Sequence, residues 1–190
     1  EARARIEGAA VLMQGDEQGV RVVPEDVLAA VAMVHVRIHD GDTQGPPRGM
    51  RIVVADVLHH HGFVVDIAEK APRIFQRIST LNTPDAESTC AAIKCSEDGR
   101  FVYASNRGDD SIAVYEMDKN TGLLNRIQIE KTRGKSPRDF FVLEDMVLAA
   151  NQDSNNITCF YRDADTGKLS AEGECIECHA PVCLIAHPEV

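Results

Sequence analysis

Two stretches of the 190-residue chain decide its fold: Phe101-Val102-Tyr103-Ala104-Ser105-Asn106 returns 45 residues later as Met146-Val147-Leu148-Ala149-Ala150-Asn151. The same spacing relates residues 111–115 to residues 156–160. It also relates two sets of turn residues, Asp118 with Thr121-Gly122 and Asp163 with Thr166-Gly167. Self-similarity at a fixed period of this length is the signature of a repeat architecture.

Each repeat contains four short runs of strand length, separated by turn residues. In the second repeat these runs are 139–143, 146–150, 157–162 and 169–177. Four antiparallel strands in about 45 residues is the pattern of a β-propeller blade. The sequence therefore predicts an all-β fold, a partial β-propeller of about three four-stranded antiparallel blades. The blade-like repeats lie at about 45–90, 91–136 and 137–185.

The repeat at 45–90 is the weakest of the three. Only residues 50–57 and 62–68 have a strand pattern before its last strand, so one strand is expected to be missing. Residues 1–44 stay unassigned, because two interpretations compete there. Pro24-Glu25-Asp26 is a favourable helix start, followed by helix-forming residues 27–33. The hydrophobic residues at 34, 36 and 38, however, alternate with polar ones as in a strand.

Composition narrows the partners that we expect. The net charge of −10 disfavours nucleic acid and anionic membranes. No apolar run approaches the roughly 18 residues of a membrane span, and the first residues do not resemble a signal peptide. We therefore expect a cytoplasmic protein with reduced cysteines. A small anionic substrate would need locally clustered arginines.

Residues from about 72 to 185 resemble the lactonase family of seven-bladed propellers, which includes propeller-type 6-phosphogluconolactonases and fungal carboxy-muconate cyclases. The resemblance is carried by segments in the order typical of the C-terminal half of that family. Among these segments are residues 78–81, 87–89, 96–101, 105–108, 110–112, 137–140, 150–154 and 181–183. One blade earlier, Gly45-Pro46-Pro47-Arg48 resembles a family motif, but Gly49 stands where the family has histidine.

Seven such repeats would need about 315 residues, and this chain is shorter. The resemblance therefore implies a truncated copy, and a second chain could complete the propeller.

The resemblance also implies a site. Lactone hydrolysis needs a base to activate water and cations to stabilise the oxyanion, and arginine suits phosphate. Glu87 is the expected acid/base, and Arg107 and Arg138 are the expected anion-binding catalytic groups. The expected substrate-binding residues are Arg48, Asn106, Asn151 and Gln152. The alternative is that Glu87 is a solvated loop residue and that the arginines pair with Asp109, Asp110 or Asp139.

No metal or other cofactor is expected, although two patterns invite one. Cys175-Ile176-Glu177-Cys178-His179 matches a haem-attachment motif, and Cys183 and His187 could extend it to zinc. It lies at the end of an expected strand, where residues i and i+3 point to opposite faces. His59-His60-His61 meets the same objection, since adjacent residues of a strand alternate in direction.

The expected function is that of a lactonase-type hydrolase, which would open 6-phospho-glucono-lactone to 6-phosphogluconate in the pentose phosphate pathway. Two alternatives stay open. One is a muconate-type lactonising cycloisomerase that uses the same groups. The other is a non-catalytic propeller remnant that acts as a binding module.

Overall fold

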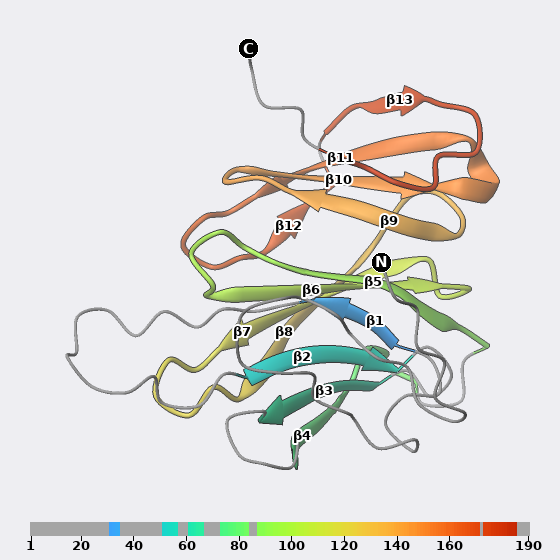
Figure 1. The fold of residues 1–190 in the computed structure, drawn as a ribbon. Coiled ribbons are helices and arrows are strands. Elements are labelled where there is room, and N and C mark those ends of the chain that lie inside the picture. Colours follow the sequence, from blue (N-terminus) through green and yellow to red (C-terminus); the bar gives the residue numbers. More distant parts are fainter. Residues whose placement is uncertain are drawn as a thin grey trace, which may run out of the picture.

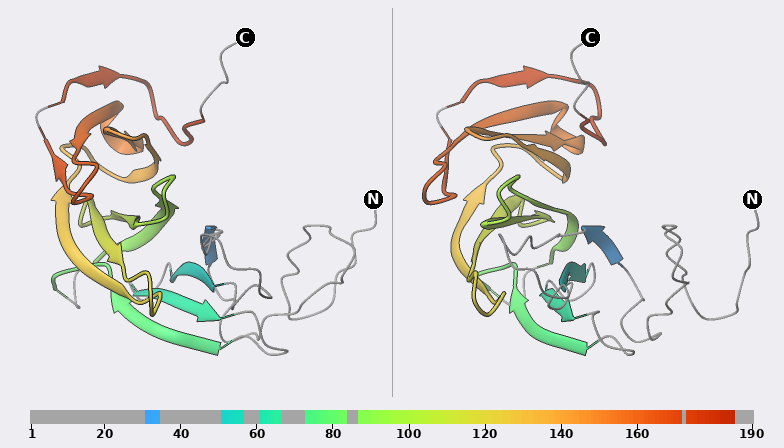
Figure 2. Two further views of the ribbon diagram at one scale, coloured as in Figure 1. Left: turned by 90° about the vertical axis from the view of Figure 1, so that its left-hand side faces the viewer. Right: turned by 60° about the vertical axis from the view of Figure 1, so that its left-hand side comes forward.

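The computed structural model describes residues 31–34, 51–56, 61–66, 73–83, 87–171 and 173–185. In these ranges the chain forms three antiparallel sheets, connected by turns and one short 3-10 helix, η1 (Gln152–Ser154). The sheets follow one another in chain order and stack face to face (Figures 1 and 2). The all-β architecture predicted from the repeat is confirmed.

Each sheet corresponds to one blade. The first contains β1 (Val31–Val34), β2 (Arg51–Asp56), β3 (His61–Asp66) and β4 (Arg73–Ser79), in that order. The second contains β5 (Thr89–Cys95), β6 (Phe101–Arg107), β7 (Ser111–Met117) and β8 (Leu124–Lys131). The third contains β9 (Pro137–Val142), β10 (Met146–Asn151), β11 (Asn156–Arg162) and β12 (Leu169–Ser170), and β13 (Cys175–Glu177) also pairs with β11.

The expectation that the first repeat lacks a strand is wrong. β1 pairs with β2 in a continuous register from Val31↔Asp56 to Val34↔Val53, which completes a four-stranded sheet. The strand was missed because residues 35–50 separate it from β2, so it lies outside a window that begins at residue 45. The structure has a strand at 31–34, so the helical interpretation of residues 27–33 is wrong for 31–33. The helix start at Pro24 and the alternating residues 36 and 38 lie outside the described residues.

The repeat offset is confirmed at the level of strand pairing. Asn106 pairs with Ser111 in the second sheet, and Asn151 pairs with Asn156 at the equivalent place in the third. The outermost strand differs, because the single run expected at 169–177 is divided into β12 and β13. A Cβ atom added to Gly173, between the two pieces, would collide with the carbonyl oxygen of Cys159. The chain backbones therefore approach closely at this interruption.

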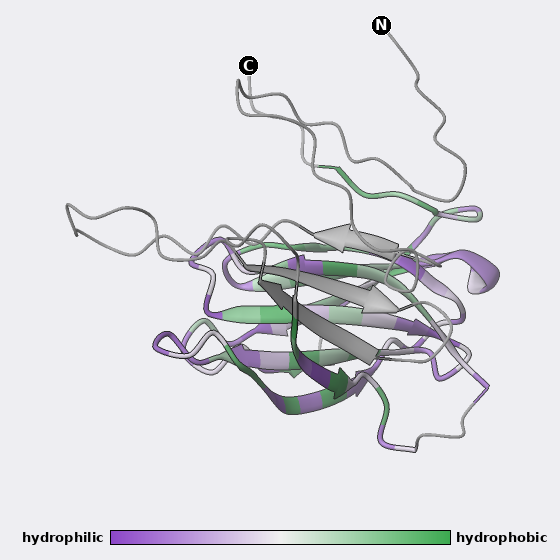
Figure 3. Cartoon of the chain, turned by 60° about the horizontal axis from the view of Figure 1, so that its bottom comes forward, coloured by the Kyte–Doolittle hydropathy of each residue, from purple (hydrophilic) through white to green (hydrophobic). Residues whose placement is uncertain are grey.

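The core lies between the sheets. One cluster packs the face of the second sheet that carries Val102 and Tyr115, with Ile78 of β4 against it. The other cluster fills the space between the second and third sheets, where Phe101 and Tyr103 meet Phe160. All six residues from Phe101 to Asn106 are buried, because both faces of β6 are covered. Figure 3 shows hydrophobic residues concentrated in the strands and hydrophilic ones in the turns.

A pair of glutamines joins the outer strands of successive sheets. The side chain of Gln76 accepts a hydrogen bond from the Leu124 N–H and donates one to the Leu124 carbonyl, both at 2.7 Å. Gln128 makes the same two contacts with Leu169, at 2.7 and 2.8 Å. Each amide thus acts as a glutamine clasp that fixes one blade against the next.

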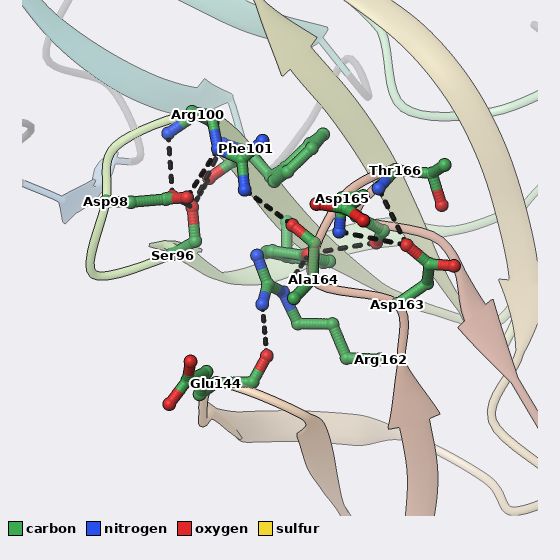
Figure 4. Close-up of polar contacts among 12 residues, drawn as sticks. Ser96, Asp98, Arg100, Phe101, Glu144, Arg162, Asp163, Ala164, Asp165 and Thr166 are labelled. Atoms are coloured by element: carbon green, nitrogen blue, oxygen red, sulfur yellow. Dashed lines mark hydrogen bonds and ion pairs between the residues drawn. The ribbon is translucent and has the colours of Figure 1, made fainter.

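Beside this second clasp, the turn between β11 and β12 adds polar contacts between the sheets (Figure 4). The carboxylate of Asp163 accepts hydrogen bonds from the N–H groups of Asp165 and Thr166, at 2.9 and 2.8 Å. Arg100 of the second sheet donates to the Ala164 carbonyl at 2.6 Å. Arg162, which is 6% exposed, donates to the Tyr103 hydroxyl at 2.7 Å and to the Glu144 carbonyl. These contacts hold the third sheet in a fixed position against the second.

The glutamine clasp gives a testable prediction. Gln128→Ala should lower the free energy of unfolding by about 1–3 kcal/mol, because the buried N–H and carbonyl of Leu169 lose their partners. Urea denaturation followed by circular dichroism measures this loss. The matched control is Asn125→Ala, at an exposed position of the same strand, which should change stability by no more than about 0.5 kcal/mol. If the two variants lowered the free energy of unfolding equally, the glutamine clasp would make no specific contribution to stability.

Candidate functional site

One end of the stacked sheets gathers nearly all of the candidate residues. The strands are antiparallel, so β5, β7 and β9 begin where β6, β8 and β10 end. Glu87 precedes β5, Arg107 ends β6, Arg138 is the second residue of β9, and Gln152 follows β10. The topology therefore brings four of the expected site residues to the same end of two neighbouring blades.

Glu87 and Arg107 lie on adjoining segments. Arg107 is paired with Thr89 across the sheet, and its carbonyl accepts a hydrogen bond from the Ser88 hydroxyl at 2.8 Å. Gly108 has φ +99°, and a Cβ atom there would collide with the Glu87 carbonyl. Glycine thus allows the two segments to touch. The Glu87 side chain is exposed, as an acid/base that meets a substrate must be.

Arg138 is exposed and contacts another expected site residue. Its guanidinium donates a hydrogen bond to the side-chain oxygen of Gln152 at 3.1 Å. Arg107 is half-buried, and among the described residues its buried Nε has no hydrogen-bond partner. Arg138 therefore retains exposed donors that a ligand could use, whereas the unpaired Nε of Arg107 lies below the surface.

The acids that could neutralise these arginines are engaged elsewhere. Asp139 pairs with Lys94 at 2.8 Å, and Asp109 pairs with Lys131 at 2.8 Å. Burial alone would raise the pKa of Asp109, but hydrogen bonds from Lys131 and Ser111 outweigh it and lower the pKa below its ordinary value. Asp110 accepts backbone hydrogen bonds. Within the ranges the structure describes, none of the three forms an ion pair with Arg107 or Arg138.

The side chains of Asn106 and Asn151 are buried and connect neighbouring segments of the sheets. Both are 0% exposed. The Asn106 amide donates to the Thr80 carbonyl at 3.0 Å and to the Ser111 hydroxyl at 3.1 Å. The Asn151 amide donates to the Thr158 hydroxyl at 2.9 Å. These contacts hold the ends of neighbouring strands together, so neither amide faces solvent. Arg48, the remaining expected substrate-binding residue, and Gly49 lie outside the described residues.

Sequence reasoning missed a contact between inner strands. Lys94 of β5 and Asp139 of β9 occupy equivalent positions, 45 residues apart, and form the ion pair described above. Lys94 Nζ also lies 5.7 Å from the ring centroids of both Phe140 and Phe141. At the next equivalent position, the N–H of Leu184 donates to the second Asp139 oxygen at 2.8 Å. The sequence does contain a signal for this ion pair, since a lysine and an aspartate occupy equivalent positions one period apart.

The cysteine-rich segment lines an open surface hollow of about 590 Å³. Its lining includes Cys175, Glu177, Cys178 and His179, together with Asn155 and Asn156. Among the described residues, no three His, Cys, Asp or Glu side chains are arranged to hold a metal ion. His59 and His60 lie outside these residues, and the expectation that no metal is bound stays a prediction.

The blade sheets and their period define a β-propeller of the type built from about 45-residue, four-stranded repeats. A sequence profile described as "Lactonase, 7-bladed beta-propeller" matches residues 64–186, which is more than half of the chain. The chain belongs to this lactonase family.

Two relatives carry an enzyme name. The 6-phosphogluconolactonase of Bacillus subtilis (strain 168) is 40% identical over 96 residues, which cover 50% of this chain and 28% of the relative. The 6-phosphogluconolactonase of Formosa agariphila is 48% identical over 83 residues, which cover 42% of this chain and 24% of the relative. The matched segments thus span about a quarter of the length of these relatives.

Solved structures show the same fold. A protein from Lactobacillus plantarum superposes with a TM-score of 0.66 at 31% identity, over 70% of this chain and 40% of that one. The periplasmic gluconolactonase of Pseudomonas aeruginosa superposes with a TM-score of 0.65 at 25% identity, over 70% of this chain and 38% of that one. Among the described residues of this chain, no helix is long and apolar enough to cross a membrane.

The cysteines should differ sharply in reactivity. Cys175 and Cys183 are exposed, whereas Cys90 is fully buried. Burial raises the pKa of Cys95 to about 12, so its reactive thiolate is scarce at neutral pH. Ellman's reagent should therefore modify the exposed thiols first and Cys90 and Cys95 only after unfolding. If all six thiols of the folded chain reacted with Ellman's reagent at one rate, the burial of Cys90 and Cys95 would be contradicted.

Proposed function

We propose that this chain supplies part of the active site of a lactonase-type hydrolase that opens 6-phospho-glucono-lactone to 6-phosphogluconate. Membership of the lactonase family and the names of the two relatives support the reaction class. The observation that carries the proposal is the position of Arg107 and Arg138. They lie at the same end of adjacent blades as Glu87, and the neighbouring acids are engaged with other partners.

The chemistry follows from these side chains. Water attacks the lactone carbonyl carbon, and Glu87 accepts the proton that the water loses. The arginines bind the phosphate and the oxyanion that develops on the carbonyl oxygen. The ring C–O bond then breaks, and the proton passes to the departing ring oxygen to give the hydroxy acid. Gln152 orients Arg138 through the hydrogen bond at 3.1 Å.

The phosphorylated substrate and a cytoplasmic location are both part of this proposal. A periplasmic gluconolactonase has the same fold, so the fold alone determines neither the phosphate group nor the compartment. Arginine is the element that favours a phosphorylated substrate, because its planar guanidinium matches phosphate geometry.

Binding tests the arginine assignment directly. Arg138→Ala should weaken the binding of 6-phosphogluconate by about 1.5–3 kcal/mol, the range for a hydrogen bond to a charged group. Calorimetry at several salt concentrations measures the loss, and the salt dependence should decrease in the variant. The matched control is Lys168→Ala, which removes an exposed cation beyond β11, at the other end of the sheet. Equal binding by wild type and Arg138→Ala would remove Arg138 from the site.

Turnover by the 190-residue chain should be weak. A site on a propeller face draws groups from several blades, and the segments of this chain that match the named relatives span only about a quarter of their length. Catalytic groups that act together are strongly non-additive, so the loss of some costs nearly as much as the loss of all. A spectrophotometric lactonase assay measures the rate, and robust turnover that disappears in Glu87→Gln would contradict this expectation.

A further inference from the structure

We propose that Asp110 is a positioning residue that fixes Arg107 and Arg138 relative to each other across two blades. This inference rests on the proposed function, in which both arginines bind one anionic substrate. Asp110 lies in the connection between β6 and β7. Within the candidate site, sequence reasoning considered it only as an acid that could neutralise the arginines.

One carboxylate oxygen of Asp110 reaches both arginine-bearing segments. Its Oδ1 accepts a hydrogen bond from the N–H of Gly108 at 3.2 Å and another from the N–H of Ser136 at 2.8 Å. Gly108 directly follows Arg107, and Ser136 lies two residues before Arg138. The backbone that carries each arginine is therefore tied to the same atom.

The backbone of Asp110 adds a second link to the same connection. Its carbonyl accepts hydrogen bonds from the N–H and the hydroxyl of Thr132, at 2.9 and 3.1 Å. Thr132 is 0% exposed and follows β8 directly. Asp110 thus holds both ends of residues 132–136, the connection that leads from the second sheet to the third.

The conformation of these segments supports a positioning role. Asp110, Arg133 and Ser136 have φ of 52°, 56° and 59°, in the left-handed region that residues other than glycine rarely adopt. Three of the five described non-glycine residues with positive φ therefore lie in two connections that contact each other, and the other two, Asn155 and Ala180, make the equivalent contact one blade later. Such backbone persists only where the surrounding contacts hold it.

Asp110 differs from an ordinary turn aspartate. Asp118, at the other end of β7, accepts from the N–H groups of Asn120 and Thr121, both within its own turn. Asp110 instead bonds to the connection of another blade, and among the described residues it forms no ion pair. Its charge therefore orders the backbone without binding the guanidinium groups that the substrate needs.

The main variant is Asp110→Gly, which removes the carboxylate while glycine tolerates the positive φ, so that the fold is preserved. Asp110→Asn is the conservative rescue, since its amide oxygen can replace Oδ1 and asparagine also tolerates this conformation. Asp118→Ala is the matched control, because it deletes backbone hydrogen bonds at the far end of the same strand. All three are compared with wild type under conditions where circular dichroism shows them folded.

Two measurements are made on each protein. Amide hydrogen exchange followed by NMR reports the N–H groups of Gly108 and Ser136. Calorimetry with 6-phosphogluconate reports affinity, with Arg107→Ala, Arg138→Ala and the double variant made in each background. Such a cycle isolates the coupling between the two arginines.

In Asp110→Gly, the two amides should exchange faster, and 6-phosphogluconate should bind more weakly by about fivefold or more as the coupling between the arginines disappears. Asp110→Asn should bind 6-phosphogluconate within about twofold of wild type and keep the coupling between the arginines. Asp118→Ala should lower stability but leave both the affinity and the coupling unchanged. Unchanged exchange in Asp110→Gly overturns the inference, as does wild-type affinity and coupling in that variant. No binding by wild type overturns the proposed function itself and the inference with it, so the two failures are distinguishable.

Discussion

The structure depends on one constraint: the second sheet is apolar on both faces and is covered on both. In the second sheet, Phe101 and Tyr103 face the third sheet, while Val102 and Ala104 face the opposite side, and all four are buried to at least 99%. Burial of one large apolar side chain stabilises a fold by about 1.5–3 kcal/mol. A single sheet with two such faces is unstable in water, so the blades stack, and this stacking brings successive strand ends to a common edge.

At that edge, buried asparagines support the strand ends, and among the described residues two arginines are not neutralised by neighbouring aspartates. Asn106 and Asn151 are buried and fix the strand ends, so the connections beyond them start from defined positions. The chain carries a net charge of −10, yet Asp109 and Asp139 pair with lysines and Asp110 accepts from backbone N–H groups. This pairing favours an anionic ligand, because each neutralised carboxylate no longer opposes its charge.

The sequence was sufficient for the second and third blades because their repeat preserves both buried positions and turn chemistry, as at Asp118 and Asp163. It did not locate β1, since the long segment 35–50 interrupts the period. It also identified Asn106 and Asn151 as equivalent without distinguishing a buried strand clamp from a ligand-binding amide, because the repeat records position and not exposure. The role of Asp110 depends on a contact with Ser136 of another blade. Asn155, one period later, accepts from the N–H of Ala180 in the same way, so the position recurs with the repeat, but the sequence alone does not show which N–H it binds.

The repeat also predicts which residues lie on the far face of the third sheet. Phe101, Tyr103, Ile112 and Val114 bury the second sheet against the third, and their equivalents 45 residues later are Met146, Leu148, Ile157 and Cys159. These four are only half-buried, because the third sheet is the last of the described arc. Leu184, one period after Asp139, donates its N–H to that aspartate at 2.8 Å. Residues 169–177 contain no glutamine to form a clasp, and Arg133 instead donates to the carbonyls of Cys159 and Gly173, both at 2.9 Å. The far face of the third sheet therefore offers half-buried apolar residues but no glutamine that could repeat the amide clasp of the first two joints.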